Sequence, residues 1–261
     1  MVRMVLEIWQ LRHFWLALAQ YDVKDRYRRS VLGIAWSLIK PAVMTLILTV
    51  VFTSVFDIAV REYAPYLFLG LLTWQFLTES ILQGCNAFRL GNTYLRVRPV
   101  PLAIFPLRVV LSAGVHGLIG LAAGIAAIGW IQGTVNPVSL VALLPGLGIL
   151  ALTAWALACI GAILNTRFAD TQQIAEISLQ ALFYATPVIY MPDSLHKTGW
   201  LHLFVRCNPF ASFLDLVRRP LLHGELPALS SILIALAFAG LTTAIAVVIL
   251  QRVEKRLVLW L

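Results

Sequence analysis

The chain has 261 residues, of which 60% are hydrophobic and only 12% charged, and its formal net charge is +8. Since a soluble domain carries about 25% charged residues and a membrane span needs about 20 apolar ones, the composition predicts roughly five to seven spans and excludes a large soluble domain. The positive charges cluster at the predicted membrane edges, where they suit anionic headgroups, so the basic excess does not indicate a nucleic-acid partner.

Residues 5–29 predict an amphipathic helix that lies in the membrane interface. One face repeats at helical spacing, with Leu6, Trp9, His13, Leu16 and Ala17. An ordinary cytosolic helix packed on the rest of the chain stays open as the alternative. The segment 22–29 is basic and costly to place in hydrocarbon, and the chain becomes apolar from Leu32. It therefore enters the bilayer here, with its N-terminus in the cytoplasm.

Six apolar segments predict six transmembrane helices, at about 32–56, 63–85, 108–131, 139–164, 174–191 and 227–250. Pro41 lies inside the first and should kink it or mark its start. The third and fourth divide a run of 58 residues, Val109 to Thr166, that holds no Asp, Glu, Lys or Arg. Of the 20 basic residues, 15 then lie in cytoplasmic segments and five outside, which predicts that both termini are cytoplasmic.

The two longest connections have distinct compositions. Residues 86–108 are basic and broken by prolines, so we expect a cytoplasmic loop with a short helix that Pro99 ends. Residues 192–226 are rich in aromatic side chains, which predicts short external re-entrant helices between spans five and six. The fold class is therefore all-α integral membrane, with an interfacial segment at 1–31 and a six-span domain at 32–261.

The sequence offers little for catalysis. It has no G-x-x-x-x-G-K-[ST] phosphate loop, no H-E-x-x-H motif and no Cys/His cluster, so we expect no nucleotide site of that kind, no metal and no catalytic residue. His116 stands alone on an apolar helix, which is typical of a hydrogen-bonded core histidine. Glu79 is the acidic residue well inside an apolar run, and helix packing and a role on a transport path both stay open for it.

The stretch R-Y-R-R-S-V-L-G-I-A-W-S-L-I-K-P at 26–41 resembles the entry to the first membrane helix of ABC-2 type permeases. It is most similar to permease subunits of lipid-linked polysaccharide exporters, such as those for O-antigen and teichoic acid. Four further stretches are similar in the same order: N-T-Y-L-R-V-R-P-V-P-L-A-I-F-P-L (92–107), R-F-A-D-T-Q-Q-I (167–174), Q-A-L-F-Y-A-T-P-V-I-Y (180–190) and N-P-F…D-L-V-R-R-P-L-L-H-G (208–224).

The resemblance implies a half-channel that pairs with a second copy of itself in the bacterial inner membrane. Two separate ATP-binding cassette subunits would hold ATP and Mg, so this chain itself carries no cofactor. The segment received by the ATPase would include Phe88, Arg89, Asn92, Leu95, Arg96 and Arg98. An interfacial gate would include Arg26, Tyr27, Arg28 and Arg29. Aromatic side chains would guide the glycan, and the candidates are Trp36, Phe52, Phe56, Tyr66, Phe68, Trp74, Phe183, Tyr184 and Tyr190.

Among cargoes, an undecaprenyl-linked O-antigen is favoured, with teichoic acid and capsule as alternatives. An ABC-2 exporter of drugs or small lipids is a second interpretation. An integral-membrane enzyme acting on lipid-linked sugars would need an acidic or metal-binding cluster, which the sequence lacks. A secondary transporter is disfavoured, since neither buried charge pairs nor an inverted repeat is visible.

Overall fold

The computed structural model describes residues 2–56, 58–97, 100–133, 137–191, 204–205 and 207–253. Within these residues the regular structure is helical and includes no strand, which confirms the predicted all-α class. The helices are α1 (Val2–Gln10), α2 (Arg12–Tyr27), η1 (Gly33–Ala35), α3 (Trp36–Phe56), α4 (Val60–Cys85), α5 (Ala87–Val97), α6 (Ile104–Gln132), α7 (Pro137–Arg167), α8 (Thr171–Ala185), α10 (Pro209–His223) and α11 (Leu229–Val253).

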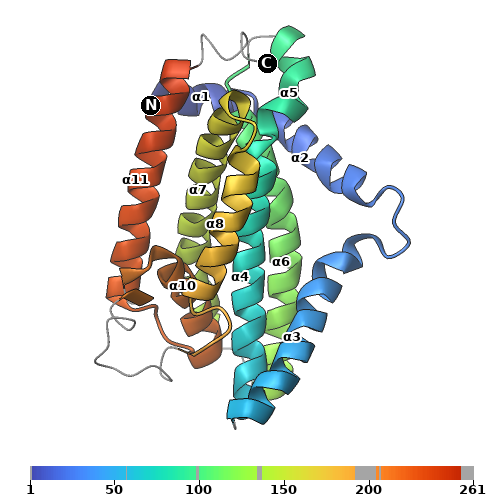
Figure 1. The fold of residues 1–261 in the computed structure, drawn as a ribbon, viewed down its shortest axis with the longest axis vertical. Helices are drawn as coiled ribbons and strands as arrows, with labels where there is room; N and C mark the ends of the chain where they lie inside the picture. Colours follow the sequence, from blue (N-terminus) through green and yellow to red (C-terminus); the bar gives the residue numbers. More distant parts are fainter. Residues whose placement is uncertain are drawn as a thin grey trace.

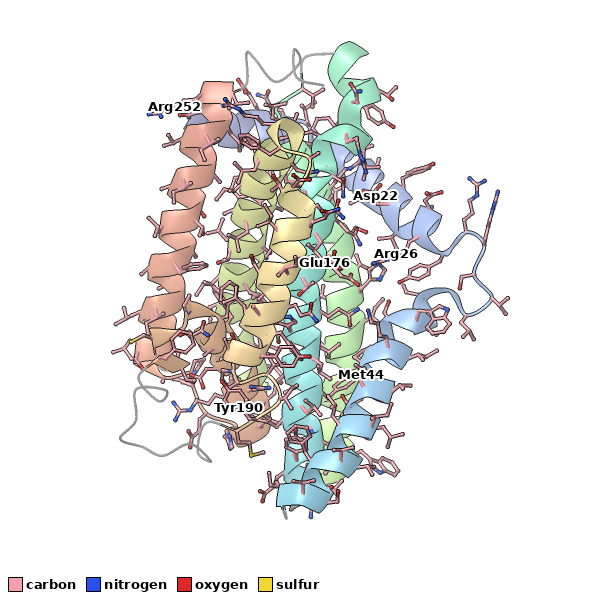
Figure 2. The ribbon with its side chains drawn as sticks, viewed as in Figure 1. Asp22, Arg26, Met44, Glu176, Tyr190 and Arg252 are labelled. Carbon is pink, nitrogen blue, oxygen red and sulfur yellow. The ribbon has the colours of Figure 1, made fainter. Side chains whose placement is uncertain are left out.

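Helix α4 runs through the middle of the bundle and packs against α3, α6, α7, α8 and α10. Helix α11 lies on the other side of α7, and α10 lies at the end of the bundle opposite α1 and α5 (Figure 1). Helix α2 slants away from the bundle, and the chain then turns back into η1 and α3 (Figure 1). The C-terminal end of α11, marked by Arg252 in Figure 2, lies at the same end as α1.

Four helical segments are long and apolar enough to cross a membrane: Gly33–Val55, Ile104–Ile131, Ser139–Arg167 and Leu229–Val253. They match the predicted first, third, fourth and sixth spans. The predicted second and fifth correspond to α4 and α8, which pack side by side in the same bundle. Helix α8 has 15 residues and is therefore about 22 Å long at 1.5 Å per residue, shorter than the predicted 174–191.

The predicted interfacial helix 5–29 is two helices, because the backbone leaves the helical conformation at Leu11. The break frees carbonyl groups in α1, and the Trp15 indole N–H donates to the Ile8 carbonyl at 2.9 Å. The predicted face of Leu6, Trp9, His13, Leu16 and Ala17 is exposed, whereas Leu18 and Ala19 are buried. The predicted face therefore does not pack on the rest of the chain.

Small residues let the central helices approach closely. A methyl group at Gly120 on α6 would overlap the Leu72 side chain on α4, and one at Gly124 would lie 3.1 Å from the Phe68 ring. At the crossing of α4 and α7, a methyl group at Gly84 would lie 2.6 Å from Ala158. Such contacts are how membrane helices pack without a hydrophobic driving force between them.

Candidate functional site

Helix α8 carries a polar face that is exposed in the structure. Gln173, Glu176, Gln180 and Tyr184 are all exposed, and Tyr184 retains 64% of its accessible surface. At about 100° per residue these four positions lie within roughly 80° of arc, so they form one line, which we call the α8 stripe. Figure 2 labels Glu176 on this helix. Amide, carboxylate and phenol groups are costly to place against hydrocarbon, so the stripe indicates a face turned to water or protein.

A second polar group joins α2 to the central helix. The Arg26 guanidinium on α2 lies 3.1 Å from one carboxylate oxygen of Glu79 on α4. The Gln75 side-chain amide donates to the other oxygen at 3.1 Å. Both oxygens of the Glu79 carboxylate therefore have a donor. Figure 2 labels Arg26 near the end of α2.

Next to this pair, Tyr27 reaches the buried His116 on α6. The Tyr27 hydroxyl lies 3.2 Å from His116 Nδ1, and the Ser37 hydroxyl on α3 lies 3.0 Å from the same nitrogen. The two hydroxyls are also 3.0 Å apart, and the rings of Tyr27 and His116 meet edge to face at 5.3 Å. His116 is thus a hydrogen-bonded core histidine, as its isolated position predicted, and it joins three helices.

One turn earlier, Asp22 forms a further contact with α6. Its carboxylate lies 3.3 Å from Nε of Arg108, whose side chain is almost fully buried. Burial raises the pKa of the Asp22 carboxyl, and the Arg108 guanidinium opposes that rise. Of the predicted gate residues, Arg26 and Tyr27 contact the bundle through Glu79 and His116. Arg26 is nevertheless exposed, as are Arg28 and Arg29.

At the opposite end of the bundle, Arg218 of α10 is buried and holds the end of α8 against α4. Its guanidinium donates to the Pro187 carbonyl at 2.6 Å, to the Val188 carbonyl at 2.8 Å and to the Tyr66 carbonyl at 3.1 Å. It also lies 3.6 Å from the centre of the Tyr66 ring. Helix α8 ends at Ala185, before Pro187, and Arg218 satisfies carbonyl groups of the two residues Pro187 and Val188 that follow.

The predicted aromatic set occupies several environments. Trp74 is buried in the core, with ring centroids 5.7 Å from Phe183 and 5.8 Å from Phe210. Phe52 stacks on Tyr63 at 5.9 Å. The Tyr190 hydroxyl donates to the Ala185 carbonyl at 3.2 Å. The other candidates whose side chains the structure describes are an exposed pair, Trp36 and Tyr184, and a half-buried pair, Tyr66 and Phe68.

Helix α5 confirms the short helix predicted in the basic loop. Phe88 is fully buried and meets Phe105 edge to face at 6.5 Å, so it anchors the helix rather than presenting a surface. Arg89 is exposed and Asn92 is half-buried. Arg98 and the side chains of Leu95, Arg96 and, on α3, Phe56 lie outside the described residues, so their assignments stay predictions.

Comparison with known proteins decides the family. Residues 13–222, which extend from the second residue of α2 to the last but one of α10, match the ABC-2 type transporter family. The chain belongs to the ABC-2 type transporter family. The resemblance predicted from the sequence stretches is thereby confirmed.

Three curated relatives of this ABC-2 transporter carry the name O-antigen export system permease protein RfbA. The one from Myxococcus xanthus is 29% identical over 251 residues, which cover 92% of this chain and 94% of the relative. Two from Klebsiella pneumoniae are 24% identical over 227 residues and 25% identical over 213 residues. These two alignments cover 86% and 81% of both chains, respectively.

Two groups of this ABC-2 transporter were missed by sequence reasoning. Three of the four α8 stripe residues were missed, since only Tyr184 was in the predicted aromatic set, although Gln173, Glu176 and Gln180 recur at helical spacings of three and four. Arg218 had no such signal, since it appears in the sequence as one of two adjacent arginines in a loop. Among the described residues no three His, Cys, Asp or Glu side chains gather as metal ligands would.

Proposed function

We propose that this chain is the channel-forming permease subunit of an ATP-driven exporter that moves undecaprenyl-linked O-antigen across the bacterial inner membrane. The family match supports transport, and the names of three relatives support O-antigen export as the system. The relative from Myxococcus xanthus aligns over 94% of its length, so the similarity behind the proposal is not confined to one shared segment.

The observation that carries the proposal is the α8 stripe. It places amide, carboxylate and phenol groups along an exposed face of a helix whose neighbours are apolar. Amides and carboxylates exchange hydrogen bonds with sugar hydroxyls, and the Tyr184 ring offers an apolar face to a sugar ring. Since such groups are costly in lipid, the stripe lines the path of the glycan.

In this arrangement α4 and α8 are the second and fifth of six membrane spans. Helix α10 is a re-entrant helix at the external side, since Arg218 ties it to the unwound end of α8. Backbone that leaves the helix at that depth must be buried in protein or line a cavity. Both termini then lie in the cytoplasm, at the end of the bundle where α1 and the end of α11 meet.

A second copy of the chain completes the channel, and two ATP-binding cassette subunits dock on the cytoplasmic side. Helix α5, with the exposed Arg89 near its start, would enter the ATPase. ATP and Mg belong to that partner, and the chain itself works without a cofactor. Arg26 and Tyr27 tie α2 to Glu79 and His116, so a movement of α2 reaches the central helices directly.

The stripe is tested by changing its chemistry without changing its packing. In cells that lack the native gene, Gln180→Leu and Tyr184→Ala are compared with Ile174→Ala. Ile174 is also exposed on α8 but lies outside the stripe. We expect both stripe variants to reach normal amounts in the membrane and to lower surface O-antigen per molecule at least twofold, while Ile174→Ala exports normally. Unchanged export per molecule in both stripe variants would contradict the proposed path.

A further inference from the structure

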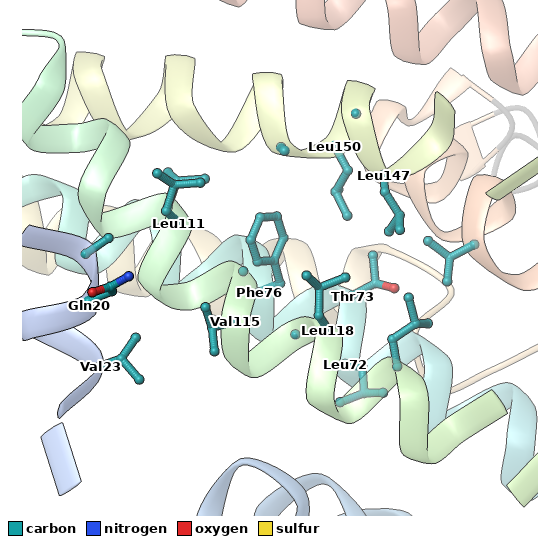
Figure 3. A pocket seen from close by; sticks show the side chains of 18 of the residues that line it. Gln20, Val23, Leu72, Thr73, Phe76, Leu111, Val115, Leu118, Leu147 and Leu150 are labelled. Carbon is teal, nitrogen blue, oxygen red and sulfur yellow. The ribbon is translucent and has the colours of Figure 1, made fainter. Parts of the chain in front are cut away.

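A large apolar cavity lies between α2, α4, α6 and α7, apart from the α8 stripe. Its volume is about 690 Å³, within the roughly 300–1,000 Å³ of ligand-binding pockets. Figure 3 shows the side chains that line it, among them Leu72 and Phe76 of α4, Leu118 of α6 and Leu147 of α7. Apart from Gln20, Lys24 and Thr73, the lining residues are all apolar or glycine.

The cavity has the length of one lipid tail. Its lining on α6 extends from Val110 to Leu121, which is about 16 Å at 1.5 Å per residue. That is about half of the roughly 30 Å hydrocarbon core of a bilayer, the depth of one leaflet. The rim residues Val115 and Leu118 are 39% and 58% exposed, so the cavity opens on the outer surface of the bundle.

The space is not a by-product of tight helix packing. A methyl group at Gly114 or Gly117 would make only ordinary contact with the Phe76 ring, at 3.9 and 3.6 Å. At Gly148, on α7, it would meet nothing within 4 Å. This contrasts with Gly120 on the same face of the bundle, where a methyl group would overlap Leu72.

Charge distinguishes the two ends of the cavity. At the α2 end, Lys24 and Gln20 line it, and Lys24 is exposed. The far end on α6 and α7 is lined by leucines, including Leu121 and Leu147. An apolar channel one leaflet deep with an ammonium group at its interfacial end matches an anionic phospholipid, whose phosphate suits the ammonium group and whose tail suits the leucines.

We propose that this cavity binds one acyl tail of a phospholipid of the cytoplasmic leaflet, with Lys24 beside its phosphate. The bound tail fills the space between α2 and the α6–α7 face, so it supports α2 in the position where Arg26 meets Glu79. The proposed lipid site does not depend on which cargo is exported. It rests on the proposed function only for the orientation of the chain, which decides that the lipid belongs to the cytoplasmic leaflet.

The test fills the cavity with a large side chain at Gly148. The control is the same substitution at a matched glycine outside the cavity. Gly240 of α11 is also exposed, also has nothing within 4 Å of an added methyl group, and does not line the cavity. Three proteins are compared: the unchanged full chain, Gly148→Phe and Gly240→Phe. Each is placed in nanodiscs of phosphatidylethanolamine and phosphatidylglycerol and then extracted and washed in detergent. Native mass spectrometry measures the lipid that stays bound. Lys24→Gln is measured in parallel.

We expect the unchanged chain and Gly240→Phe to retain phosphatidylglycerol after detergent washing, and Gly148→Phe to retain at least fivefold less. Lys24→Gln should lose the preference for phosphatidylglycerol over phosphatidylethanolamine. If Gly148→Phe is not recovered folded, Leu118→Trp at the rim replaces it with the same expectation. Equal retention in the cavity and control variants would overturn the proposal, as would retention of an added polyprenyl phosphate in place of phospholipid.

Discussion

Replacing Arg218 by alanine removes three hydrogen bonds to carbonyl groups, at 2.6, 2.8 and 3.1 Å, together with the contact to the Tyr66 ring. Because this side chain is buried, the Pro187 and Val188 carbonyls are left without its N–H donors. Since a hydrogen bond from a charged group contributes about 1.5–3 kcal/mol, losing the two shortest of these bonds should cost about 3–6 kcal/mol. At roughly 2–4 °C per kcal/mol for a domain of 150–250 residues, the midpoint of thermal unfolding should fall by about 10 °C.

The adjacent Arg219 provides the control. Its side chain is 39% exposed and lies 3.9 Å from Glu225, a solvated pair that contributes about 0–1 kcal/mol. Both alanine variants are purified in the same detergent and heated while the monodisperse fraction is measured by size-exclusion chromatography. A large loss for Arg218→Ala and little change for Arg219→Ala are expected. Equal midpoints for the two variants would refute the assigned role of Arg218.

Three further outcomes are expected. Trp74→Ala should lose about 3–5 kcal/mol of stability, because the ring is buried in the core. Quantitative immunoblots should therefore show less Trp74→Ala protein in the membrane and an unchanged amount of Tyr184→Ala protein. A double-mutant cycle of Arg26→Gln and Glu79→Gln should give a coupling of only about 0.2–1 kcal/mol by thermal unfolding, since both side chains are partly exposed. Reporter fusions after Glu225 and at the C-terminus should report opposite sides of the membrane, and the same side for both would exclude the six-span arrangement.

Much of the helical layout was predictable because charge marks the ends of membrane helices. The uncharged run from Val109 to Thr166 predicted two long helices, and α6 and α7 are those helices. The basic loop predicted α5, whereas the fifth span was predicted to continue to residue 191 and α8 ends at Ala185, two residues before Pro187. The break at Leu11 was not predicted, since neither proline nor glycine marks it.

The contacts between distant segments were not predictable from one sequence. Arg26 and Glu79 are 53 positions apart, and Tyr27 and His116 are 89 apart, so no local spacing pairs them. Arg218 and Arg219 are identical in type and adjacent, yet one is buried and the other is half-exposed. Their difference arises from the carbonyls at the end of α8, which only the folded chain brings near.

The central claim is that the glycan passes along the α8 stripe, and in-cell photo-crosslinking tests it most directly. A benzoylphenylalanine residue is introduced at Gln180 or at Tyr184, and at Leu236 on the exposed face of α11 as the control. After irradiation of cells that are exporting O-antigen, the two stripe positions are expected to give adducts that an O-antigen antibody recognises, and Leu236 none. Active export with no glycan adduct at either stripe position would contradict the account.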